Sequence, residues 1–117
     1  DRAYVAYLDG GAVILDISDK ANPKVITNWR YSPPYNGFCH TVMPLMSRDM
    51  LLVTDECTKD DGLDWPKLGW VVNASTENNL VPMSTLPLPP LESFVKRGGR
   101  YGAHNIHENL PGPASFR

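Results

Sequence analysis

Short apolar runs separated by turn-forming residues dominate this sequence. The runs are rich in β-branched and aromatic residues and too short for stable helices, which favours strands. Glycine, proline, asparagine and aspartate lie between them and favour tight turns. The pattern predicts six strands, at residues 2–8, 12–17, 24–29, 50–54, 68–72 and 81–86. Because consecutive strands are joined by turns rather than by helices, we predict an all-β fold of antiparallel meanders.

The polar residues of one turn recur in a second turn further along the chain. Three pairs share an offset of 57 residues: Asp16 with Asn73, Ser18 with Ser75, and Asn22 with Asn79. An earlier pair, Asp9 with Asp55, has an offset of 46, which predicts an 11-residue insertion in the hairpin loop of the second copy. A repeat period of roughly 40–60 residues is typical of propeller arrays. We therefore interpret the chain as two copies of one repeat.

Two similar glycine-led segments flank the second copy. Residues 37–43 precede it and residues 102–107 follow it, and each carries a histidine soon after its first glycine, His40 and His104. We predict that both segments begin a new blade and that the two histidines are equivalent. Residues 91–96 are predicted to form one or two helical turns that link the blades.

Residues 12–24 and 69–75 resemble the repeat of the LVIVD family, and the second of them is a degenerate copy with Asn73 in place of the aspartate. Residues 35–56 and 98–113 resemble blade-starting segments of a bacterial branch of that family. Its members are taken to be β-propellers, distantly similar to the selenium-binding proteins. The resemblance therefore implies a propeller fold, and it implies little about chemistry.

The resemblance and the repeat together predict a single β-propeller segment of about two antiparallel blades plus the first strand of a third. Its parts are a partial blade at 1–34, a second blade with a hairpin-loop insertion at 35–90, a linker at 91–100, and the start of the next blade at 101–117. A closed propeller needs roughly four to eight four-stranded blades. We therefore expect a fragment of a larger propeller, whose partners are the remaining blades of the same protein or another subunit.

Charge and composition exclude two classes of function. Eleven Lys and Arg against thirteen Asp and Glu give a net charge of −2, so we expect no nucleic-acid partner. No apolar run approaches the ~20 residues of a membrane span, and the N-terminus lacks the regions of a signal peptide. We expect a soluble chain, with its compartment open. Cys39 and Cys57 fit either a disulfide or two reduced, buried thiols.

Histidines and carboxylates form the one set of residues with catalytic or ligand potential. The candidate metal ligands are His40, His104, His107 and Asp55, and the candidate proton-transfer groups are Glu56 and Glu108. Imidazole and carboxylate together suit Zn, Cu, Fe or Ni. Since the first strand of each propeller blade lines the central channel, equivalent histidines would converge there. The alternative is that the histidines hydrogen-bond neighbouring blades and that Asp55 caps a turn.

Two functions of different classes follow from these alternatives. In the first, the chain is a non-catalytic interaction or structural scaffold, and we favour this hypothesis. In the second, it belongs to a metal-dependent hydrolase or oxidoreductase with channel-lining histidines as ligands. The acidic stretch at 60–64 lacks the ligand spacing of a calcium loop, so we expect a solvated loop there. Trp29, Trp65 and Trp70 are predicted to pack in the core and between blades.

Overall fold

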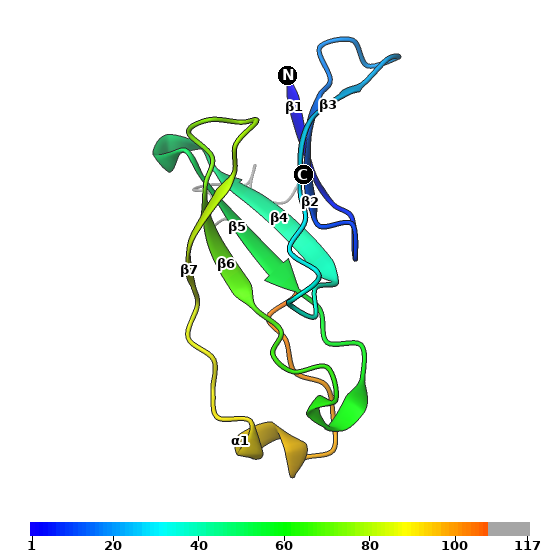
Figure 1. The fold of residues 1–117 in the computed structure, drawn as a ribbon, viewed down its shortest axis with the longest axis vertical. Helices are drawn as coiled ribbons and strands as arrows, with labels where there is room; N and C mark the ends of the chain where they lie inside the picture. The colour runs from blue at the N-terminus through cyan, green and yellow to red at the C-terminus, as the bar shows by residue number, and fades with distance from the viewer. Residues whose placement is uncertain (108–117) are drawn as a thin grey trace, which may run out of the picture.

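A computed structural model describes residues 1–107 of the protein and has an all-β fold (Figure 1). Seven strands, two short 3₁₀ turns and one short helix follow each other along this part of the chain. They are β1 (Arg2–Ala6), β2 (Ala12–Asp16), β3 (Lys24–Trp29), β4 (Cys39–Leu45), η1 (Met46–Arg48), β5 (Met50–Asp55), η2 (Asp60–Gly62), β6 (Gly69–Asn73), β7 (Val81–Thr85) and α1 (Glu92–Val95). The six strands predicted from the apolar runs are all present, and the segment at 37–43 supplies the seventh.

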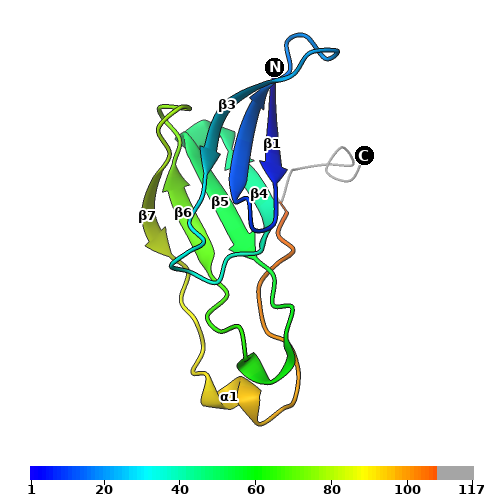
Figure 2. The same ribbon diagram turned by 45° about the vertical axis from the view of Figure 1, so that its right-hand side comes forward.

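The strands form two antiparallel sheets, and the first lies against one face of the second (Figure 2). The first sheet has the order β1-β2-β3, and the second has the order β4-β5-β6-β7. The second sheet therefore has one strand more, β4, which pairs with β5. An isolated antiparallel bridge between Leu8 and Cys39 joins the loop between β1 and β2 to the start of β4.

The two sheets repeat each other in local detail, at the offset of 57 that the turn residues predicted. The Ser18 N–H donates to the Asp16 carboxylate at 2.9 Å, and the Ser75 N–H donates to the Asn73 side-chain oxygen at 2.9 Å. The pairing of β2 with β3 shifts register between Ile14 and Leu15, and the pairing of β6 with β7 shifts at the equivalent residues Val71 and Val72. The same turn and the same bulge thus occur twice, which confirms the two copies.

The length predicted for the hairpin insertion is wrong by two residues. Arg2 pairs with Asp16 in the first sheet, and Met50 pairs with Asn73 in the second, so the strands before the hairpins are offset by 48 rather than 46. The offset is 48 before the hairpin loop and 57 after it. The hairpin loop of the second sheet is therefore nine residues longer than that of the first, not 11. Asp55 therefore corresponds to Tyr7 and not to Asp9. An aspartate near a turn is too common to fix an alignment without the strand register.

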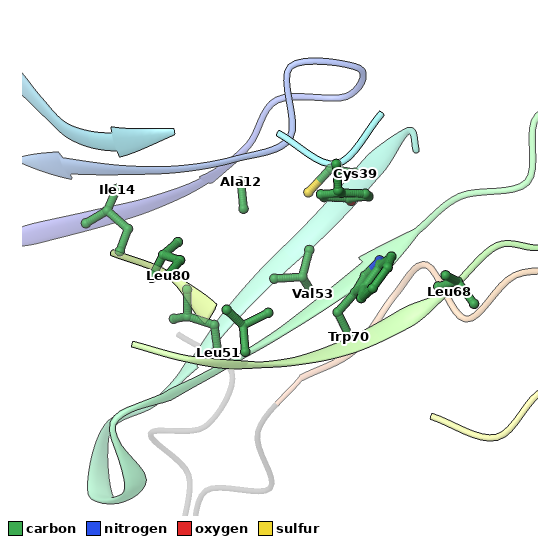
Figure 3. Close-up of a cluster of buried hydrophobic side chains, with 10 residues drawn as sticks. Ala12, Ile14, Cys39, Leu51, Val53, Leu68, Trp70 and Leu80 are labelled. Atoms are coloured by element: carbon green, nitrogen blue, oxygen red, sulfur yellow. The ribbon is translucent and has the colours of Figure 1, made fainter. Parts of the chain in front are cut away.

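Alternation along each strand gives each sheet two different faces. We call them face A and face B, and equivalent residues of the two copies lie on the face with the same letter. Face A of the second sheet carries Leu51, Val53, Trp70 and Val72. Face B of the first sheet carries Tyr4, Ala6, Ala12 and Ile14. Face A of the second sheet packs on face B of the first, and the buried side chains there form the hydrophobic core (Figure 3).

The chain after β7 runs through α1 at the lower end of the molecule and returns along the second sheet (Figure 2). Residues 101–107 contain no regular secondary structure, and residues 108–117 lie outside the described part, so the predicted first strand of a third blade stays a prediction. Within residues 1–107, none of the helices is both long and apolar enough to cross a membrane.

Candidate functional site

Three of the predicted site residues lie together beside the start of β4. The rings of His40 and His104 meet edge to face with their centroids 4.7 Å apart. The Nε2 atom of His40 lies 3.8 Å from the Glu56 carboxylate, and both side chains are about one-third exposed. The predicted proximity of the two histidines is therefore present in the structure. We call His40, Glu56 and His104 the histidine cluster.

Local backbone contacts position the histidine cluster. The hydroxyls of Thr41 and Thr54 both donate to the backbone carbonyl of His104, at 2.6 and 2.7 Å. The two threonines are paired across β4 and β5, so they fix His104 against the sheet from adjacent strands. Gly102 packs closely too, because a Cβ atom there would come within 3.1 Å of the Asp55 carbonyl oxygen.

Both ring nitrogens of His40 and the Nδ1 atom of His104 face partners within the protein. His40 Nδ1 lies 3.1 Å from the Thr41 hydroxyl while its Nε2 faces Glu56. His104 Nδ1 lies 3.4 Å from the carbonyl oxygen of Gly102. No group of three or more His, Cys, Asp or Glu side chains between residues 1 and 107 has an arrangement that could hold a metal ion.

Asp55 lies apart from the histidine cluster, in the core. Its side chain is 1% exposed and accepts a hydrogen bond from the Tyr31 hydroxyl. The Leu68 N–H and the Trp70 indole N–H donate to its second oxygen at 3.3 and 3.4 Å. Burial raises the pKa of Asp55, although these hydrogen bonds and Lys67 favour its ionised form. Asp55 therefore organises the core between the sheets.

An aromatic cluster surrounds this carboxylate. The rings of Trp29 and Tyr31 pack against Trp70, with centroids 5.5 and 5.2 Å away. The core and inter-sheet role predicted for Trp29 and Trp70 is confirmed. Trp65 instead packs on Tyr101, at 5.7 Å, in the segment that follows α1.

The remaining two predicted residues lie at or beyond the end of the described chain. His107 is exposed. Glu108 lies outside the described residues, so its role as a proton-transfer group stays a prediction.

The inserted loop contains a buried ion pair that the sequence pattern did not predict. Asp64 and Lys67 are 7% and 4% exposed, and the Lys67 ammonium lies 3.2 Å from the Asp64 carboxylate. Cys57 and Thr58 donate hydrogen bonds to the same carboxylate. The Lys67 ammonium also donates to the Gly37 carbonyl at 3.1 Å. The prediction of a solvated loop at 60–64 is wrong for Asp64, which is buried. The sequence signal for the ion pair was the spacing of three residues between Asp64 and Lys67.

The two cysteines are both free and buried. Burial raises the pKa of Cys39 to about 11, so its thiol stays protonated at neutral pH. Burial also raises the pKa of Cys57, which donates to Asp64 at 3.0 Å. Of the two alternatives left by the sequence, the structure has the reduced thiols.

Comparison with known proteins shows that part of the chain is similar to a repeat family. Residues 1–30 match the LVIVD repeat. They span the first sheet, from β1 to the end of β3. No curated protein and no solved structure matches the chain.

Proposed function

Starting from the LVIVD repeat at residues 1–30, we propose that this chain is a propeller-type scaffold without catalytic activity of its own. The observation that carries the proposal is that the side chains with chemical potential are used by the fold. The Asp55 carboxylate accepts hydrogen bonds in the core, and the His40 ring has Nδ1 beside the Thr41 hydroxyl and Nε2 beside Glu56. The role of the histidine cluster is then to hold residues 101–104 against the second sheet.

The way in which the sheets stack supports a propeller arrangement. Face A of the second sheet covers face B of the first, so the two sheets stack head to tail. A head-to-tail stack can add further sheets in the same sense, because each added sheet leaves the same pair of faces at the two ends. Propellers are built in this way.

Metal content and stability together test the scaffold proposal. The full chain would be washed with a mild chelator and its metals quantified by elemental mass spectrometry, and thermal melts would be recorded for His40→Ala and His104→Ala. The scaffold proposal predicts far less than one metal per chain and a lower melting temperature in both variants. A near-stoichiometric transition metal that both variants lose, while they stay folded, would overturn it.

The second candidate function is a metal-dependent enzyme, and the geometry of the histidine cluster is the observation that favours it. Two imidazoles and the Glu56 carboxylate lie close together and are partly accessible, and these donor types suit Zn, Cu, Fe or Ni, although their arrangement in the described residues does not hold an ion as it stands. A bound ion would supply Lewis-acid or redox chemistry. The His40 ring would first have to turn a nitrogen away from Thr41 or Glu56. Glu56 would then hold or move a proton, unless it became a ligand itself.

A further inference from the structure

The first sheet has an apolar face that nothing in the described chain covers. Face A of this sheet forms a shallow groove of about 260 Å³ lined by Val5, Tyr7, Val13, Leu15, Val25 and Asn28. Tyr7 and Val25 are each 66% exposed. Five of the six lining residues are apolar or aromatic, which is unusual for a freely solvated sheet face.

The repeat shows what this face is built to contact. Each residue at its centre has an equivalent in the second sheet at the offsets of 48 and 57: Val5 with Val53, Val13 with Trp70, and Leu15 with Val72. Those equivalents are at most 5% exposed, because they pack on face B of the first sheet. The same residue positions are therefore buried in one copy of the repeat and open in the other.

The opposite end of the stack, face B of the second sheet, is covered at Thr54 by the backbone of His104 and is accessible further along the strands. Face B of the second sheet carries Leu52 and Val71, both half-buried, which are the equivalents of Tyr4 and Ile14. Met83 is the equivalent of Ile26, which packs against the core between the sheets, and Met83 is 59% exposed. The contact between the two sheets of one chain can therefore be continued by a second chain.

We propose that face A of the first sheet binds face B of the second sheet of another copy of this chain, and that such contacts close into a ring. The inference rests on the proposed scaffold function and continues the interface already present between the two sheets. A head-to-tail contact either closes into a ring or grows into an open filament. Propellers close at four to eight sheets, and each copy contributes at least the two sheets of its described residues, so a closed ring holds at most four copies.

The test is the molar mass of the full chain in solution, measured by sedimentation equilibrium over a concentration series. Wild type is expected to form a closed assembly of two to four chains. Val25→Lys on face A and Met83→Lys on face B should each weaken association at least about tenfold, because each buries an unpaired ammonium in an apolar contact. Tyr7→Lys provides a second variant on face A, and circular dichroism melts establish that each variant is folded.

Leu63→Lys is the matched control, since Leu63 is apolar, 77% exposed and located in the inserted loop, away from both faces. It should assemble like wild type. A monomer at all concentrations would overturn the proposal. A dimer that Val25→Lys breaks and Met83→Lys leaves intact would overturn it as well, because the first sheets would then pack on each other. A monomeric, metal-free chain would contradict the ring and leave the scaffold proposal intact. Stoichiometric metal in an assembled ring would contradict the scaffold proposal and leave the ring intact.

Discussion

Buried polar groups are the residues on which the stability of this small fold depends most. Asp55 and the pair of Asp64 and Lys67 are each less than 10% exposed. No buried side-chain nitrogen or oxygen of the described chain is left without a hydrogen-bond partner. Removing one partner from such a group costs more than the hydrogen bond contributed, because the remaining group is neither solvated nor paired.

The Tyr31 hydroxyl is expected to stabilise the fold through the Asp55 carboxylate. Tyr31→Phe removes a donor to this buried group and should lower the free energy of unfolding by about 1–3 kcal/mol. Urea denaturation measures the change. Tyr35→Phe is the matched control, because Tyr35 also packs on Trp70 but is 46% exposed. An equal effect of the two substitutions would contradict the role assigned to Asp55.

Removing one partner of the Asp64–Lys67 ion pair should lower the free energy of unfolding strongly, whereas replacing both partners by apolar residues should lower it much less. Lys67→Met leaves a buried carboxylate without its counter-ion and should destabilise the protein by about 3–5 kcal/mol. Combining it with Asp64→Leu should restore much of this loss, since a buried pair replaced by apolar residues is often neutral. Lys59→Met, at an exposed position of the same loop, should change stability by less than about 0.5 kcal/mol. A double variant less stable than Lys67→Met alone would disprove this account.

Asp64 should also make stability depend on pH. Burial opposes its ionisation, but hydrogen bonds from Cys57 and Thr58 and the charge of Lys67 outweigh burial, so the pKa of Asp64 is lowered. Its stabilising contribution is present above the unfolded pKa of about 3.9 and is lost as the pH falls below that value. Urea midpoints between about pH 5 and pH 3 should fall more steeply in wild type than in Asp64→Asn. Parallel curves would show that Asp64 is not the titrating group.

At the scale of elements, the sequence predicted every strand but only part of the site. Apolar runs and turn residues are local signals, and β2 with its turn is a good example of a segment that they define. The partners of Asp55 come from positions 24 residues before it and 13 and 15 residues after it. Such contacts depend on how two sheets pack, and no local pattern encodes that. His40 and His104 lie together in the structure, but their equivalence in the repeat stays a prediction, because residues 101–107 form no strand.

The segment at 101–107 should depend on two threonine hydroxyls for its attachment to the second sheet. Replacing both Thr41 and Thr54 by valine keeps their shape and removes both donors to the His104 carbonyl. Two lost hydrogen bonds should increase hydrogen exchange in this segment by about tenfold or more. Exchange measured by mass spectrometry, with exposed Thr76→Val as control, provides the test. Unchanged exchange in the double variant would mean that other contacts hold the segment.

At the scale of the whole molecule, two equivalent sheets stack head to tail and leave complementary faces at the two ends. This arrangement follows from one repeat used twice, and it underlies both the scaffold proposal and the proposed ring. The stacking sense is therefore the central claim. If face A of the first sheet instead packed on the second sheet, neither proposal would stand.

Methyl–methyl nuclear Overhauser effects, recorded on a methyl-labelled sample, test the stacking sense most directly. The account predicts contacts from Ile14 to the methyl groups of Leu51, Val53 and Leu80 within one chain. Contacts from Val13 or Leu15, if observed between chains, should reach Val71 rather than Val53. Contacts from Val13 or Leu15 to Val53, in place of those from Ile14, would contradict the account.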